Sequence, residues 1–167
     1  MLLVLGVLLA AAVLMNQLRE KALTGKLYRQ PAALLLFAGL SLSFMHALTG
    51  ADWLMLLTTG AVAFTLGLLQ GRYSPLIHHD GAWYVSGSLL AACVWLTSIP
   101  VRYALYALTV RFLSPTPALI GASTFIVYLT FIGALLLGRY SMLFVRYPQF
   151  LRCVGQNEKQ LRRQRGL

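Results

Sequence analysis

The sequence predicts an all-α membrane protein with five transmembrane helices, an outer N-terminus and a cytoplasmic C-terminus. A small cytoplasmic β-hairpin is expected between the third and fourth helices. Three observations support this class. Of the 167 residues, 59% are hydrophobic and 11% are charged, whereas a soluble domain has about 25% charged residues. The apolar residues gather in five runs, and Lys and Arg lie mostly at one end of those runs. A chain with so little polar surface needs lipid as its solvent.

Five stretches are long enough to cross about 30 Å of hydrocarbon, which takes about 17 to 25 apolar residues. They are residues 2–18, 31–48, 53–70, 85–109 and 118–138. The first could also be a secretory signal, but no basic residue precedes it and the charges follow it. That order favours an anchor whose N-terminus lies outside. We expect one domain over residues 1–150 and a basic cytoplasmic tail over residues 151–167.

The basic residues set the orientation. With an outer N-terminus, only Arg102 and Arg111 of the fourteen Lys and Arg fall on the outer side. The reverse orientation would place the other twelve outside, against the positive-inside rule. The net charge of +10 is then explained by topology and by anionic lipid, with no need for nucleic acid. We expect membrane lipid as a partner and the bacterial inner membrane as the location.

The loop between the third and fourth spans carries a turn signal. Asp80-Gly81 lies between apolar and aromatic residues, which is typical of a two-residue hairpin with positive φ at both turn positions. We expect Trp83 to lie near the lipid headgroups. His78 and His79 are adjacent, so on a strand they point to opposite faces and do not readily share a metal. Weak metal binding together with Asp80 stays open as an alternative.

The sequence lacks the residues that dithiol or haem chemistry and proton-coupled transport require. Cys93 and Cys153 are isolated, and the chain has no Cys-x-x-Cys. Only His46 lies within a span, so paired haem ligands are missing. Glu20, Asp52, Asp80 and Glu158 all lie outside the spans, which argues against a proton-coupled transporter acting alone. We therefore expect no cofactor, no metal and no catalytic residues.

Arg102 and Asp52 form the candidate polar pair. Arg102 lies within an apolar run, where a charge is costly and is a functional candidate. It falls near the outer boundary, where its side chain can reach the interface. Asp52, in the turn between the second and third spans, is the only outer carboxylate and its natural partner. The pair could be structural or could bind a substrate.

Small residues suggest close helix packing. Gly67 and Gly71 form a Gly-x-x-x-Gly, which suits a neighbouring helix or a second copy of the chain. The string from Phe64 to Ser74 recurs 67 residues later, so that Gly71 corresponds to Gly138. The echo could record a duplicated helical hairpin or a shared way of ending a helix at the interface.

The central segment resembles a known family. The residues concerned are Leu68-Leu69-Gln70-Gly71-Arg72, Asp80 through Ser88, Trp95 and Arg102-Tyr103. Over about residues 17–110 they resemble the small bacterial CcdC-like integral membrane proteins, a family linked to cytochrome c maturation. The resemblance implies a helical membrane architecture. The chain departs from what haem or thiol chemistry requires, so no activity is carried over.

Two functions remain after these exclusions. The first is a non-catalytic accessory or assembly protein that works with a larger membrane complex. The second is a protein that transports or handles a small solute or lipid, as a homo-oligomer, with the fourth helix lining the path. The small polar residues of that helix, from Ser86 to Ser98, suit either close packing or a narrow pocket. An enzyme that uses Arg102 and Asp52 on a polar headgroup is a weaker third reading.

Overall fold

The computed structural model describes residues 21–45, 48–79, 82–112, 124–149 and 152–157. In chain order the elements are β1 (Lys21–Ala22), α2 (Gly25–Ser43), α3 (Gly50–Arg72), β2 (Leu76–His79), β3 (Ala82–Val85), α4 (Leu89–Phe112) and α5 (Thr124–Arg146). Within these residues, three helices are long and apolar enough to cross a membrane: α3, α4 over Leu89–Thr109, and α5. The expectation of a helical membrane protein with a small hairpin is confirmed at this level.

The predicted spans and the helices agree in part. The third, fourth and fifth spans correspond to α3, α4 and α5. The second is a helix, α2, but it begins at Gly25 and so includes Lys26 and Arg29. It is not among the three helices that meet the criteria for a span. The first predicted span lies outside the described residues.

Two helix boundaries differ from the sequence expectation. Pro31 was expected in the first turn of the second span but lies inside α2, six residues after its first residue. A proline there leaves the carbonyl four residues earlier without its helical donor. The last helix does not stop at Gly138 but continues to Arg146.

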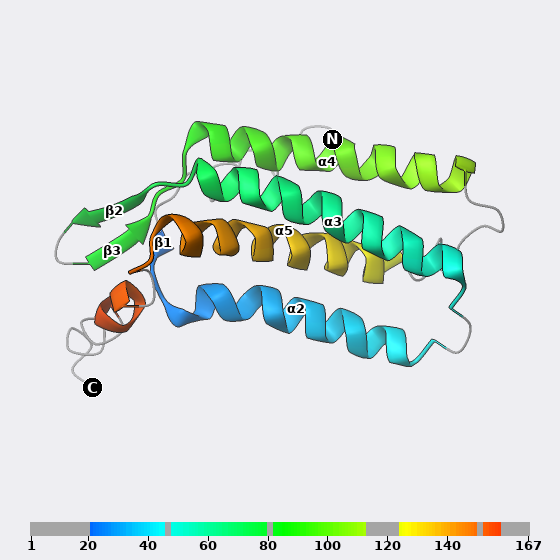
Figure 1. The fold of residues 1–167 in the computed structure, drawn as a ribbon, viewed down its shortest axis with the longest axis horizontal. Coiled ribbons are helices and arrows are strands. Elements are labelled where there is room, and N and C mark those ends of the chain that lie inside the picture. Colours follow the sequence, from blue (N-terminus) through cyan, green and yellow to red (C-terminus); the bar gives the residue numbers. More distant parts are fainter. Residues whose placement is uncertain (1–20, 46–47, 80–81, 113–123, 150–151, 158–167) are drawn as a thin grey trace, which may run out of the picture.

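The four helices lie side by side in the order α4, α3, α5, α2 (Figure 1). The central helices α3 and α5 run in the same direction and make the most extensive contact. The outer helices α2 and α4 pack on α5 and α3, respectively. The pairs α2–α3 and α4–α5 are helical hairpins. The first helix of each pair packs against the second helix of the other pair. This order is symmetric. A two-fold rotation about an axis parallel to the helices would exchange α3 with α5 and α2 with α4 and leave the order unchanged.

Glycine brings α3 and α5 into backbone contact. A Cβ atom on Gly67 would lie 2.0 Å from the Leu135 carbonyl oxygen, and one on Gly138 would lie 2.2 Å from the Phe64 carbonyl oxygen. No side chain fits at such distances. Gly71 packs in the same way on Arg139, with its Cβ position 2.5 Å from the carbonyl oxygen. All three glycines named from the sequence therefore lie in one contact within the bundle, and superposition of the two hairpins with Gly71 on Gly138 stays a prediction.

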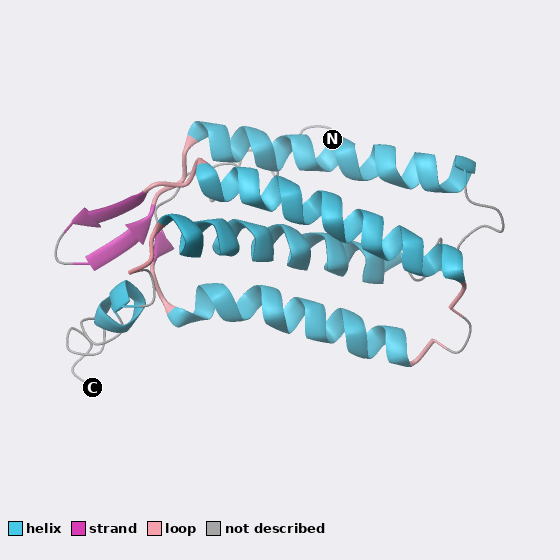
Figure 2. Cartoon of the chain, in the orientation of Figure 1, coloured by secondary structure: helices cyan, strands magenta, loops and turns pink. Residues whose placement is uncertain are grey.

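A small sheet covers one end of the bundle, which we call the sheet end (Figure 2). Its strand order is β1-β3-β2, and both pairings are antiparallel. His79 pairs with Ala82, so only residues 80 and 81 connect β2 to β3, and the predicted hairpin is confirmed. The predicted positive φ at Asp80 and Gly81 lies outside the described residues. Strand β1 was not predicted, because two residues carry no readable alternation.

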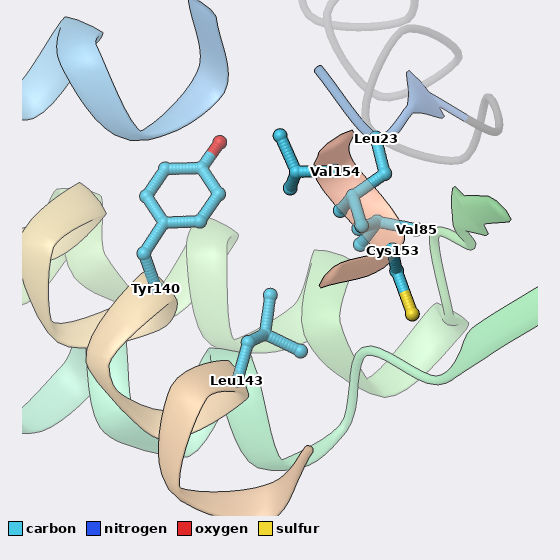
Figure 3. Close-up of a cluster of buried hydrophobic side chains, with 6 residues drawn as sticks. All are labelled: Leu23, Val85, Tyr140, Leu143, Cys153 and Val154. Atoms are coloured by element: carbon cyan, nitrogen blue, oxygen red, sulfur yellow. The ribbon is translucent and has the colours of Figure 1, made fainter. Parts of the chain in front are cut away.

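The sheet and the C-terminal segment share one hydrophobic cluster. Its buried residues are Leu23, Val85, Tyr140, Leu143, Cys153 and Val154 (Figure 3). Residues 152–157 are helical, and Cys153 and Val154 are each 5% exposed. The beginning of the segment assigned to a basic tail is thus packed against the bundle. Both cysteines are free.

Candidate functional site

A cavity with polar residues in its lining lies along α4. It has a volume of about 490 Å³ and is lined by α4 and α5, with Gln70 contributed by α3. Tyr128 and Arg139 are the first and last α5 residues along it. These two residues are eleven positions apart, which is about 16 Å along a helix. The cavity is therefore a long slot with an arginine at each end, Arg102 beside Tyr128 and Arg139 beside Gln70.

A smaller cavity continues from the end of the slot that is farther from the sheet. Its volume is about 150 Å³, and it shares Arg102 and Tyr103 with the slot. Its other walls include Thr59 of α3 and Thr124 of α5. The two cavities share Arg102 and Tyr103, so they lie next to each other along α4. Lining by the fourth helix, one of the alternatives from the sequence, agrees with this geometry.

Aromatic rings hold the Arg102 side chain. Its guanidinium carbon lies 4.3 Å from the centroid of the Tyr128 ring and 5.9 Å from that of Tyr103. Such contacts are worth about 0.5–2 kcal/mol, more when desolvated. They offset part of the cost of a charge within an apolar helix. Arg102 is half-buried and faces both cavities.

Asp52 has a different setting. Its side chain is fully buried and accepts hydrogen bonds from the Thr49 amide at 2.8 Å and from the Thr49 hydroxyl at 2.7 Å. Thr49 in turn accepts from the Asp52 amide, which completes a capping box at the start of α3. Asp52 lines neither cavity that Arg102 faces. The Thr49-x-x-Asp52 spacing could have revealed the cap, and a direct Asp52–Arg102 ion pair stays a prediction.

Arg139 and Gln70 were not singled out from the sequence. Both side chains are buried, with exposed fractions of 8% and 2%, and both line the slot. In the described part of the chain, neither Arg139 Nε nor Gln70 Oε1 has a hydrogen-bond partner. The signal was present in the α5 pattern, since Arg139 follows Tyr128, Ile132 and Leu135 at helical spacing. The burial of Arg139 was not predicted, because an arginine at a helix end usually lies at the membrane interface.

Of the two hairpin histidines, His78 lies beside an aromatic residue. His78 pairs with Trp83 across the strands, and their ring centroids are 4.6 Å apart. His79 follows on β2, and Asp80 lies outside the described residues. Among the residues that the structure describes, no group of three His, Cys, Asp or Glu could hold a metal ion.

A third cavity is the apolar counterpart of the slot. It has a volume of about 510 Å³ and is lined by α2 and α3, with Thr130 and Ala134 of α5. Leu35 and Ala61 line it, and these positions lie 67 residues before Arg102 and Tyr128. At these positions, which follow the offset of the repeated string, the third cavity has the apolar residues Leu35 and Ala61 in place of the cation and its aromatic partner. Of these three cavities, the two along α4 are the ones with a charged residue in their lining.

Comparison of the chain with protein-family models, curated proteins and solved structures finds no match. The resemblance to CcdC-like proteins therefore rests on the sequence motifs alone.

Proposed function

We propose that this protein binds and moves an anionic amphiphile or small anion along α4, without catalysing a reaction. The observation that carries the proposal is the pair of adjoining cavities that share Arg102. A charged residue within the apolar part of a membrane helix often marks a pathway or a ligand site. Among the cavity-lining residues there is no carboxylate. An anion in these cavities would therefore meet guanidinium groups without a carboxylate in the same lining.

The apolar walls favour an amphiphile over a simple ion. Between the two arginines, the slot is lined by residues such as Trp95, Ile99, Phe131 and Leu135. A hydrated inorganic ion gains little from such walls, whereas an acyl chain gains about 0.8 kcal/mol for each buried CH₂. Of the two functions left open by the sequence, handling of a lipid or solute is the better supported.

A second candidate is the accessory or assembly role. It is favoured by β2 (Leu76–His79), which forms an edge of the three-stranded sheet and exposes Ile77. Edge strands can pair with a strand of another protein. A larger membrane complex could dock there. A homo-oligomer through Gly67 and Gly71 is disfavoured, since both glycines are used within the bundle.

The topology that accompanies the proposal has five spans, an outer N-terminus and a cytoplasmic C-terminus. It is supported by Arg72, Arg139, Arg146 and Arg152, which lie toward the sheet end, as expected for the cytoplasmic face. The bacterial inner membrane is the proposed location.

The test measures amphiphile binding by the full chain in mild detergent. A fluorescent anionic amphiphile is titrated into wild-type protein and into Arg102→Gln, with Arg111→Gln as the matched control. Arg111 is exposed, lies nine residues later on α4 and lines neither cavity. We expect Arg102→Gln to weaken binding about tenfold, since hydrogen bonds to charged groups are worth about 1.5–3 kcal/mol. Equal affinity of all three proteins, or co-purification of a stoichiometric protein complex with empty cavities, would favour the accessory role.

A further inference from the structure

Gln70 and Arg139 form the polar end of the slot, and each has a side-chain atom without a described hydrogen-bond partner. Both side chains are more than nine-tenths buried, and both line the cavity. Within the described residues, Gln70 Oε1 has no donor and Arg139 Nε has no acceptor. Buried polar groups in proteins are nearly always hydrogen-bonded. Both residues line the same cavity, so a ligand bound there could supply the missing partners.

The two groups lie at the same depth in the bundle. Gly71 follows Gln70 directly, and its Cβ position is 2.5 Å from the Arg139 carbonyl oxygen. The atoms in need of partners are of opposite kind, because Arg139 Nε donates and Gln70 Oε1 accepts. A ligand that pairs with both groups therefore presents an acceptor oxygen and a donor proton.

Arg139 differs from an ordinary interfacial arginine. Arg72 occupies the matching position of the echoed Gly-Arg-Tyr-Ser string, 67 residues earlier. Arg72 is exposed and Tyr73 is 39% exposed, whereas Arg139 and Tyr140 are 8% and 6% exposed. An arginine that only marks the interface extends to water, as Arg72 does. Arg139 is instead buried at the slot, so the same motif serves another purpose in α5.

The charge balance points to an anion. The polar lining of the slot consists of Arg102, Arg139, Gln70 and Ser98 together with tyrosine and tryptophan, without a carboxylate. The Ser98 hydroxyl already donates to the Trp95 carbonyl oxygen at 2.6 Å. Guanidinium groups bind phosphate oxygens through short, charge-assisted hydrogen bonds. The depth of Arg139, level with the end of α3, suits a lipid phosphate near the membrane surface at the sheet end.

We propose that Gln70 and Arg139 bind the headgroup of a phosphate-bearing lipid from the leaflet at the sheet end. Arg139 Nε donates to a phosphate oxygen, and Gln70 Oε1 accepts from a hydroxyl or amine of the same headgroup. The apolar walls of the slot then take part of an acyl chain. This inference rests on the proposed function, since it names the class of amphiphile that the same cavity binds.

Lipids of defined headgroup test it with the full chain in neutral nanodiscs. Phosphatidylglycerol supplies both a phosphate and hydroxyl donors, phosphatidylcholine a phosphate without a donor, and a diacylglycerol glycoside hydroxyls without a phosphate. Retained lipid is counted by native mass spectrometry after release from the disc. We expect phosphatidylglycerol to be retained about tenfold more than the glycoside. Phosphatidylcholine should be intermediate.

Arg139→Gln and its matched control Arg72→Gln separate site binding from general attraction to anionic lipid. The first substitution should abolish the preference for phosphate, and the control should leave it unchanged. Gln70→Leu should equalise phosphatidylglycerol and phosphatidylcholine while both remain above the glycoside. This second variant decides the matter if Arg139→Gln does not fold.

Three results would overturn the inference. They are equal retention of phosphatidylglycerol and the glycoside, an equal effect of Arg72→Gln and Arg139→Gln, and displacement of the lipid by millimolar inorganic phosphate or glycerol phosphate. The last would assign the site to a soluble anion. If lipids are retained in an Arg102-dependent manner but without a phosphate preference, the proposed function stands and only this inference fails. If no amphiphile is retained at all, both fail.

Discussion

The side-chain amide of Asn157 pairs with both backbone polar groups of Trp83. Its Oδ1 accepts from the Trp83 amide at 2.8 Å, and its Nδ2 donates to the Trp83 carbonyl oxygen at 2.6 Å. The same Nδ2 group donates to the Leu23 carbonyl oxygen at 3.2 Å. Asn157 is 1% exposed. One side chain thus joins the C-terminal segment to β3 and to the residue that follows β1.

Asn157→Leu should destabilise the sheet end. The substitution leaves the Trp83 amide without its described side-chain partner, and an unpaired buried group costs about 1–3 kcal/mol. Hydrogen exchange of the β2–β3 amides should accelerate, while α3 and α5 keep their protection. Gln156→Leu is the control, because Gln156 is exposed. Unchanged exchange in the sheet would show that the amide contributes little.

Cys153 reports on the same contact. Burial raises the pKa of its thiol above the usual range, so less of the reactive thiolate exists at neutral pH. We expect slow alkylation of Cys153 at pH 7.5 in a Cys93→Ala background, with a rate that rises with pH through and beyond the usual thiol range. Asn157→Leu should accelerate it at pH 7.5. Fast alkylation of the parent protein would contradict the packing of residues 152–157.

Gly138→Ala should disrupt the α3–α5 contact. The added methyl group would lie 2.2 Å from the Phe64 carbonyl oxygen, so the helices must separate. Overpacking of this kind costs about 1–3 kcal/mol or more. Gly39→Ala is the control, because nothing lies within 4 Å of its Cβ position and alanine favours helix. Denaturation in mixed micelles should show a loss for Gly138→Ala only.

Gly67→Ala extends the same prediction to the other helix. Its Cβ position is 2.0 Å from the Leu135 carbonyl oxygen, so a similar loss is expected. The double variant with Gly138→Ala should lose less than the sum of the two single losses, because one separation of the helices relieves both clashes. Full additivity would mean that the two glycines act in separate contacts.

Asp52→Asn and Arg102→Gln should act independently on stability. Asp52→Asn weakens the capping box with Thr49, which is worth about 0.5–2 kcal/mol. Arg102→Gln removes the contact with the Tyr128 ring. Without shared described contacts, the two losses should add within about 0.5 kcal/mol. A double variant more stable than this sum by over about 1 kcal/mol would support the direct ion pair expected from the sequence.

Reporter fusions test the proposed orientation. Fusions after Arg29, at Asp80 and at the C-terminus should report the cytoplasm, and fusions at Asp52 and Pro115 the outer side. A control chain in which Arg72, Arg146 and Arg152 are replaced by Gln should show mixed orientation. An external C-terminus in the parent protein would rule out five spans with an outer N-terminus.

The sequence by itself determined the membrane class, the positions of the apolar helices and the β2–β3 hairpin. These features depend on local composition and on turn preferences, which neighbouring residues carry. It misplaced the start of α2, because Lys26 and Arg29 mark the end of a span by charge but do not end a helix. It also missed β1 and the packing of residues 152–157, since both depend on partners far along the chain.

Only the tertiary structure decided which polar residues form the site. Arg72 and Arg139 stand in the same local string, yet one faces outward and the other lines a cavity. Local sequence cannot distinguish them, because burial depends on which face of each helix its neighbours cover. Asp52 is the opposite case, because its helix cap with Thr49 is a local motif that the Thr49-x-x-Asp52 spacing carries. Long-range packing, set here by the glycine contact of α3 with α5, makes the choice between the two arginines.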